Sequence, residues 1–260
     1  SSDLGRSTIG WVGEGAPKPV GELAFDPITL AHNKIAGIVV ITEELARFSD
    51  PSAEATVQRD LIEQSAQFLD DAFINPAYAG VAGVSPASVT NTSTAIPASG
   101  SDSDAFLCDL QSMIQAMLSA KVSPAGAYIV MSSVQAAALS MFRNALGQYD
   151  FPTLTVNGGT LGGFPVVTSE NVPTDSTGAS IIAIVKPSEI LLADDGSVTL
   201  DASREATLDM VGGPTPTFNL WQRNCVGIRA ERYITWKKRR PEAVVYISGA
   251  NYSNCPAINP

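Results

Sequence analysis

The chain has 260 residues, of which 45% are hydrophobic and 16% are charged, and its formal net charge is −10. This length and apolar content support a large buried core and exclude a disordered chain. The acidic balance argues against a protein that neutralises the phosphates of nucleic acid, and the low charged fraction indicates surface that is buried between subunits.

The cysteines and the apolar runs narrow the class of protein further. Cys108, Cys225 and Cys255 are widely spaced and odd in number, so we expect reduced thiols in a cytosolic protein, with neither a disulfide framework nor a zinc site. No apolar run reaches the roughly 18 residues of a membrane span, which predicts a soluble protein. The start "SSDLGRSTIG" lacks Met and the order of a secretory signal, which suits a chain whose N-terminal part has been removed.

The first part of the chain predicts a long hairpin. The segment "VGELAFD" precedes the β-branched, partly alternating run 28–42, and Pro27 lies near the expected turn. The stretch "WVGEGAPKP" before it is rich in Gly and Pro, and the hairpin has little apolar mass of its own. It should therefore project from the body and become stable only when it packs on a neighbour.

A long helix is expected next. Asp50 can cap its start, and Pro51 suits the first turn because the N–H that proline lacks is unpaired there anyway. Apolar residues then recur at steps of three and four until Asn75 and Pro76 end the pattern. The sequence predicts one amphipathic helix over residues 51–75, with a length of about 33 Å.

A loop and a second helix follow. Residues 77–103 are small, polar and rich in turn-forming types, which predicts a loop that divides two lobes. A second amphipathic helix should begin after a cap at Ser103 or Asp102, with Cys108 as a small core residue on it.

The remainder alternates between strands and one more helix. "AYIVM" at 127–131 predicts a buried strand, and Ser132 or Ser133 can cap a helix that stops at Gly147. Strands are then predicted for "FPVVTS", "SIIAIV", "SVTLDA", "CVGIRAERYITW" and "EAVVYISG", the last two joined by "KKRRP". The fold class is α+β with mixed, interrupted sheets.

The sequence predicts no catalytic, cofactor-binding or metal-binding residues. The run "GGTLGG" at 158–163 could approach a phosphate, but "FPVVTS" after it favours extended chain, whereas a phosphate loop opens a helix. We therefore prefer a structural loop. His32 is the only histidine and lies in the expected hairpin turn, a poor position for catalysis. Adjacent acidic pairs and "KKRRP" are interpreted as solvated charge, with a docking patch for an acidic neighbour as the alternative for the basic run.

Five stretches in this order resemble the major capsid proteins of tailed bacteriophages, of the Hong Kong 97 type. They are "WVGEGAPKP" leading into a hairpin, "ITEEL" before the long helix, "DDAFINP" at its end, "GGTLGGFPVVTSENVP", and "AERYITWKKRRPEAVV" near the C-terminus. Each motif alone is loose, but together they cover nearly the whole chain.

The resemblance implies a division of the chain. Residues 1–11 would be the remnant of an N-terminal arm, and residues 12–42 an extended E-loop hairpin with Trp11 to Pro19 at its base. A peripheral domain would comprise residues 43–122, with the long spine helix and the loop 77–103. Residues 123–215 would form mainly the axial domain. Residues 216–260 would return to the peripheral domain and end in a tail.

The resemblance also implies contact residues, partners and a location. Candidates for contacts between subunits are Trp11, Glu14, Lys18, Glu22, Phe25, His32 and Lys34. The partners would be copies of the chain in pentamers, hexamers and a shell, phage portal, scaffolding or protease proteins, and encapsidated DNA without specific recognition. The shell would belong to the virion and assemble in the bacterial host cytoplasm, without a membrane.

Two further questions arise from the resemblance. Some family members link subunits by an isopeptide bond between an E-loop lysine, which Lys18 matches, and an asparagine assisted by a buried glutamate. Asn219 and Asn224 are poor matches and no glutamate follows Glu205 in that region, so an interfacial ion pair of Lys18 is the preferred interpretation. The alternative functions are a nanocompartment shell around a cargo enzyme and a small-molecule enzyme that uses "GGTLGG".

Overall fold

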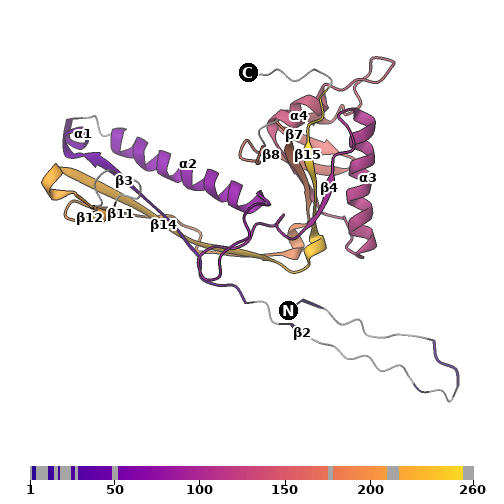
Figure 1. Cartoon of the computed structure of the whole chain (residues 1–260), viewed down its shortest axis with the longest axis horizontal. Helices are drawn as coiled ribbons and strands as arrows, with labels where there is room; N and C mark the ends of the chain where they lie inside the picture. Colours follow the sequence, from indigo (N-terminus) through magenta and orange to yellow (C-terminus); the bar gives the residue numbers. More distant parts are fainter. Residues whose placement is uncertain are drawn as a thin grey trace.

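The computed structural model describes residues 2–3, 11–14, 17, 25–26, 29–48, 52–174, 178–209 and 217–253. Figure 1 shows an extended lobe and a more compact lobe, with the first described residues lying apart from both. Both lobes combine helices with sheets, in agreement with the expected α+β class.

The extended lobe is built on one long strand. Strand β14 (Cys225–Lys238) pairs antiparallel with β3 (Lys34–Thr42) on one side and with β10 (Ile190–Asp194) and β11 (Thr199–Ser203) on the other. A short helix, α1 (Glu43–Phe48), follows β3, and β12 (Thr207–Asp209) pairs with β13 (Thr217–Asn219).

The predicted long helix corresponds to α2 (Ser52–Ile74), which lies along this sheet (Figure 1). Leu61 of α2 packs in a small cluster with Ile228 and Ala230 of β14. Half-buried side chains pack against this cluster, among them Val57 of α2, Val39 of β3 and Leu200 of β11. The amphipathic stripe of α2 is therefore used on the sheet.

The hairpin expected over residues 12–42 is not formed by the predicted pair of strands. Lys34–Thr42 pairs with β14, with Val39 opposite Ile228, whereas β2 (Phe25–Asp26) pairs with β1 (Ser2–Asp3). The physical reason is that β14 carries buried apolar residues on the face that also contacts α2. The β-branched run therefore takes a partner almost 200 residues away. Residues 20–24 of "VGELAFD" lie outside the described residues.

The compact lobe contains a mixed sheet of seven strands in the order β4-β15-β9-β5-β8-β7-β6. The strands are β4 (Thr94–Pro97), β5 (Tyr128–Met131), β6 (Leu154–Thr155), β7 (Gly158–Leu161), β8 (Phe164–Thr168), β9 (Ser180–Val185) and β15 (Val244–Ala250). The pairs β4/β15 and β5/β8 are parallel, and the other neighbours are antiparallel.

Helices α3 (Ser103–Ser119) and α4 (Ser133–Ser140) pack on one face of this sheet. Asp102 caps α3 by accepting from the Ala105 N–H, and Ser132 caps α4 by accepting from the Gln135 N–H. Each cap is at one of the two positions predicted for it. Helix α4 ends at Ser140, well before the expected stop at Gly147. Cys108 is exposed on α3, so its expected place in the core is wrong.

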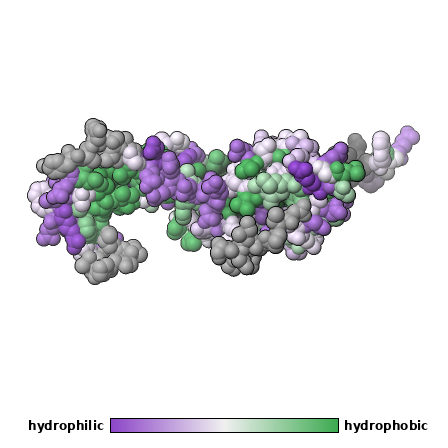
Figure 2. Space-filling view, turned by 90° about the horizontal axis from the view of Figure 1, so that it is seen from above, coloured by the Kyte–Doolittle hydropathy of each residue, from purple (hydrophilic) through white to green (hydrophobic). Residues whose placement is uncertain are grey.

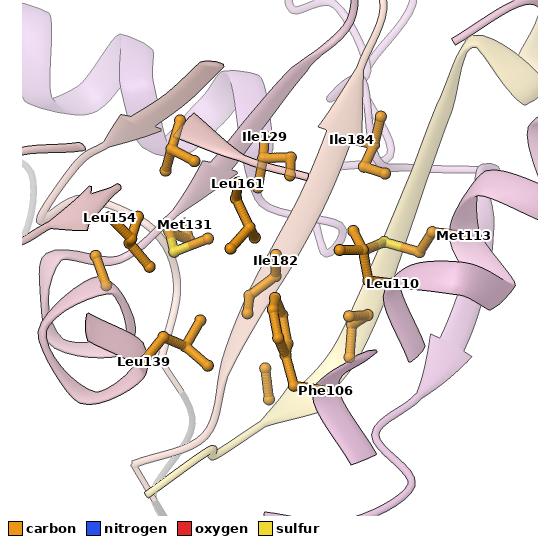
Figure 3. Packing of buried hydrophobic residues seen from close by; sticks show 14 of the residues in the cluster. Phe106, Leu110, Met113, Ile129, Met131, Leu139, Leu154, Leu161, Ile182 and Ile184 are labelled. Atoms are coloured by element: carbon orange, nitrogen blue, oxygen red, sulfur yellow. The ribbon is translucent and has the colours of Figure 1, made fainter. Parts of the chain in front are cut away.

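The main core lies between these helices and the sheet. Figure 3 shows Phe106 and Leu110 of α3 and Leu139 of α4 directed toward Ile182 and Ile184 of β9. The opposite face of the sheet packs on the end of α2 and on β14, in a cluster that includes Ile74, Ala183 and Trp236. Strand β9 is buried along its whole length because both of its faces are covered.

The division into lobes differs from the expected one. Helix α3 was expected in the peripheral segment 43–122 and β15 in the returning segment 216–260, yet both pack with β5 and β9. Conversely, β10 and β11 pair with β14, although 123–215 was expected to be mainly axial. Residues from distant segments of the chain pack in one core. A lobe therefore does not correspond to one continuous range of residues.

Candidate assembly surfaces

The residues predicted to contact other subunits have different surroundings. Trp11 is completely exposed, Glu14 is exposed, and both belong to the segment apart from the lobes. His32 is exposed before β3, and Phe25 lies in β2. Lys18 and Glu22 lie outside the described residues. Trp11, Glu14 and His32 are thus exposed surface residues, and the described candidates do not come together as a catalytic site would.

Strands β1 and β2 pair with each other, and Trp11 lies near the middle of the stretch of sequence between them. Ser2 pairs with Asp26 and Asp3 with Phe25, so residues 3 and 25 lie together. Trp11 is well inside this interval along the chain. This placement differs from the expectation that Trp11 to Pro19 form the base of the hairpin.

Lys34 is paired within the chain. Its Nζ lies 3.1 Å from Glu231 Oε1, and Glu231 also lies 3.6 Å from Arg229 Nη1. Arg229 Nη2 in turn contacts Asp201 Oδ2 at 2.8 Å, and this hydrogen bond raises the pKa of Arg229. Two cations and two anions therefore compensate one another across three strands, on the face of the sheet opposite α2.

The basic run "KKRRP" is largely used inside the chain. Lys238 Nζ donates to Asn91 O at 2.7 Å and to Ser93 Oγ at 2.6 Å, and Arg240 lies 4.0 Å from Glu189. The Arg239 N–H donates to Glu189 O. These bonds fasten the turn between β14 and β15 to neighbouring loops, as a structural turn requires.

Lys238 makes a pH-dependent contribution to stability. Burial lowers its pKa from 10.5 to about 8. Between these values the unfolded chain binds more protons than the folded chain, so the free energy of unfolding should rise with pH. We expect the melting temperature of the wild type to rise relative to Lys238→Met between pH 8 and 10, followed by calorimetry. Lys237→Met, at the exposed neighbour, should run parallel to the wild type, and parallel behaviour of Lys238→Met would contradict the argument.

The glycine-rich run is part of the sheet of the compact lobe. Gly158 and Gly159 begin β7, while Gly162 and Gly163 form the turn into β8. All four have positive φ, a backbone conformation that other residues rarely adopt. A strand follows where a phosphate loop would open a helix, so the run has a structural explanation.

One buried polar cluster was not foreseen. Asp109 of α3 is 3% exposed and accepts hydrogen bonds from Tyr252 Oη at 2.6 Å and from the Ser99 N–H at 2.9 Å. Burial, and then Asp109, raise the pKa of Tyr252. The cluster fixes the segment after β15 to α3. Its signal in the sequence was a carboxylate within the apolar stripe of a helix, between Phe106 and Met113.

Large apolar side chains remain exposed on both lobes. Figure 2 shows hydrophobic patches over each lobe, separated by hydrophilic surface. The exposed apolar side chains of the described residues include Phe68 on α2, Val84 in the loop after it, and Met141 and Leu146 after α4. Soluble monomers rarely expose large contiguous apolar patches, and such patches usually mark interfaces.

The described residues contain no group of three or more His, Cys, Asp or Glu that could hold a metal ion. Among the described helices, none combines the length and the apolar character needed to cross a membrane. In the region suggested for a cross-link, Asn224 and Glu205 are exposed, and the Asn219 side chain bonds to Thr207 and to the Gln222 N–H. The buried glutamate that this chemistry requires is not found beside them in the described region.

Comparison with known proteins agrees with these features. The model of the phage capsid family matches residues 2–249. The chain is 43% identical over 249 residues to the capsid polyprotein of Pseudomonas phage PAJU2, covering 93% of this chain and 37% of the polyprotein. It is 22% identical to the probable major capsid protein of Mycobacterium phage D29, covering 94% of this chain and 77% of that protein. The chain thus spans only about a third of the first relative.

Solved structures share the fold at low sequence identity. The structure of Gordonia phage Cozz matches with a TM-score of 0.69 at 17% identity, covering 94% of this chain and 78% of that one. The capsid of the native GTA particle matches with a TM-score of 0.67 at 17% identity, covering 95% and 83%. Mycobacterium phage Adephagia matches with a TM-score of 0.64 at 18% identity, covering 100% and 84%.

The solved structures show that the two-lobed fold is of the Hong Kong 97 type, and the family model and the 43% identical relative define the chain as a phage capsid protein. The chain belongs to the phage capsid family. The resemblance noted in the sequence is confirmed.

Proposed function

We propose that this chain is the shell-forming subunit of an icosahedral bacteriophage or prophage capsid. Copies of it would assemble into pentamers and hexamers that enclose the DNA genome in the virion. The family match over residues 2–249 is the observation that carries this proposal. Assembly would occur in the host cytoplasm, with portal, scaffolding or protease proteins as transient or minor partners.

The energetics of the extended lobe support association. Among the described residues, its hydrophobic cluster has three buried members, Leu61, Ile228 and Ala230, so the lobe gains stability when further apolar surface is covered. The compact lobe has a much larger core of its own. We propose that the extended lobe and the N-terminal segment are the parts most dependent on neighbouring copies.

The contact residues follow from this proposal. Trp11, Glu14, Lys18, Glu22, Phe25 and His32 would face other copies, with Lys18 as an ion-pair partner rather than a cross-link. Lys34 would act through its pairing with Glu231. The net charge of −10 suits a shell that holds DNA without binding the duplex tightly.

The direct test is the mass and shape of the purified chain at low and high concentration, by light scattering and negative-stain microscopy. Closed shells or capsomer rings are expected. A strict monomer at all concentrations and ionic strengths would contradict the proposal. Co-purified enzyme cargo in place of DNA would favour the nanocompartment alternative.

Removal of the N-terminal segment should separate folding from assembly. Residues 4–24 would be replaced by Asn-Gly, a pair that favours a tight turn between β1 and β2. The hydrophobic clusters of the described lobes use residues from Val39 onward, so the melting temperature should be unchanged. Higher assembly should be lost. A cooperative loss of folding would instead show that this segment belongs to the core.

A further inference from the structure

The extended lobe contains an apolar pocket that the described residues leave open. It has a volume of about 270 Å³ and lies between α2, the loop 78–86, β3 and β14. Its lining includes Phe68, Tyr78, Val84 and Trp236, and we call it the aromatic pocket. An apolar cavity of about 150 Å³ holds a benzene molecule, so this pocket has room for a larger aromatic side chain.

The walls of the aromatic pocket are held in place by contacts within the chain. Trp236 Nε1 donates to Ala87 O at 2.8 Å, and its ring meets Phe73 edge to face at 5.3 Å. Val81 N donates to Ser85 O at 3.0 Å, which shapes the loop at the rim. Despite this support, Phe68 is 50% and Val84 65% exposed. The described residues therefore form the pocket without covering it.

One polar atom of the lining also lacks a partner. Asn33 is 7% exposed, its Nδ2 donates to Thr235 Oγ1 at 3.1 Å, and its Oδ1 is buried without a hydrogen bond. A buried acceptor without a donor is costly. This oxygen is screened from the open pocket, so the surface that the pocket offers to an occupant is mainly its apolar lining.

The chain carries a tryptophan in the complementary situation. Trp11 is completely exposed, and the described residues 11–14 lie apart from both lobes (Figure 1). A tryptophan presents a large apolar area, and buried tryptophans in pockets dominate the energetics of many interfaces. Glu14 lies three residues further along and is exposed as well.

We propose that Trp11 of one copy inserts its indole into the aromatic pocket of a second copy. This inference rests on the proposed shell function and names the site at which the N-terminal segment of one subunit binds the next. Because the donor and the receiving surface differ, the contact is head-to-tail and can propagate around a ring of subunits. It leaves the aromatic pocket of each copy available to only one neighbour.

Disulfide trapping tests this contact directly. Trp11→Cys and Val84→Cys would be combined in a chain carrying Cys108→Ser and Cys255→Ser, with the buried Cys225 left in place. Under assembly conditions with mild oxidation, we expect a ladder of covalent dimers, trimers and larger species. Each single cysteine variant should give dimers at most, because a ladder requires two different linked positions per copy.

A matched control uses a position of similar exposure elsewhere. Val156 is 45% exposed on the compact lobe, so Trp11→Cys with Val156→Cys should give no ladder. An equal ladder from that pair would overturn the proposal by showing random collision. Shells without a ladder from the Val84 pair would overturn the pocket contact and leave the shell function intact. A wild type that never assembles, together with no ladder, would overturn both.

A second measurement needs no cysteines. Trp11→Ala should raise the protein concentration needed for assembly by at least about tenfold, since tryptophan anchors in pockets are typical hot spots. Trp221→Ala, at another exposed tryptophan, is the control and should change it little. The melting temperature of the unassembled chain should be the same for all three proteins. Assembly of Trp11→Ala at the wild-type concentration would contradict the insertion.

Discussion

Phe106→Ala is expected to lower the free energy of unfolding by about 3–5 kcal/mol, the range for truncating a buried aromatic residue. Phe106 is completely buried at the centre of the main core (Figure 3). Its ring meets Phe151 at 5.5 Å and Tyr252 at 5.0 Å, both edge to face. The substitution removes these contacts and leaves a cavity that α3 cannot close, because Leu110 and Met113 already pack on the same sheet.

Urea unfolding followed by circular dichroism would measure this loss. The matched control is Leu107→Ala, because Leu107 is the next residue of the same helix and is 47% exposed. It should change the free energy of unfolding by less than about 1 kcal/mol. Similar losses at both positions would show that the burial pattern of α3 is not the one described. Loss of shell formation by Leu107→Ala with unchanged stability would indicate that α3 contacts another subunit.

Gly159→Ala is expected to destabilise the compact lobe by more than about 3 kcal/mol, since strain and a steric clash act together. Gly159 has φ of +142°, in a region used essentially by glycine alone. A Cβ at this position would fall on Thr153 O, and this oxygen also accepts the Thr160 N–H bond that holds β7 in place. Neither backbone group can move without breaking the edge of the sheet.

Gly163→Ala provides the control for backbone strain alone. Gly163 has φ of +87°, but an added Cβ would meet no atom within 4 Å. Its cost should be about 1–2 kcal/mol. Equal effects of the two substitutions in urea unfolding would contradict the steric argument. The same proteins also test the nucleotide alternative, because a nucleotide-dependent rise in melting temperature that Gly159→Ala abolishes would argue for a ligand site.

The local features of this protein could be predicted from the sequence. The apolar stripe before Asn75 and Pro76 gave the long helix to within a residue at each end, since helical periodicity depends only on neighbours in the chain. Caps at Asp102 and Ser132 followed from the same local chemistry. The family resemblance was read from five ordered motifs, which a comparison with 43% identity now supports.

The pairing of strands that are far apart in the sequence could not be predicted. The run 34–42 has the composition of a strand, but its composition does not say which strand it pairs with. Its partner is β14, and the decisive property is the common apolar face toward α2. The assignment of α3 and β15 to lobes failed for the same reason, because a core collects stripes from distant segments.

For the candidate surfaces, too, local features could be predicted from the sequence and long-range contacts could not. Turn chemistry, which is a local property, predicted an exposed turn at His32 and a structural role for the glycine run, whereas Trp11 was named through the family resemblance. Only the tertiary structure showed that Lys34 is compensated by Glu231 and that Phe68, Val84 and Trp236 enclose a pocket. A pocket exists only where α2, a loop and two strands meet, and that meeting depends on cooperative burial across the whole chain.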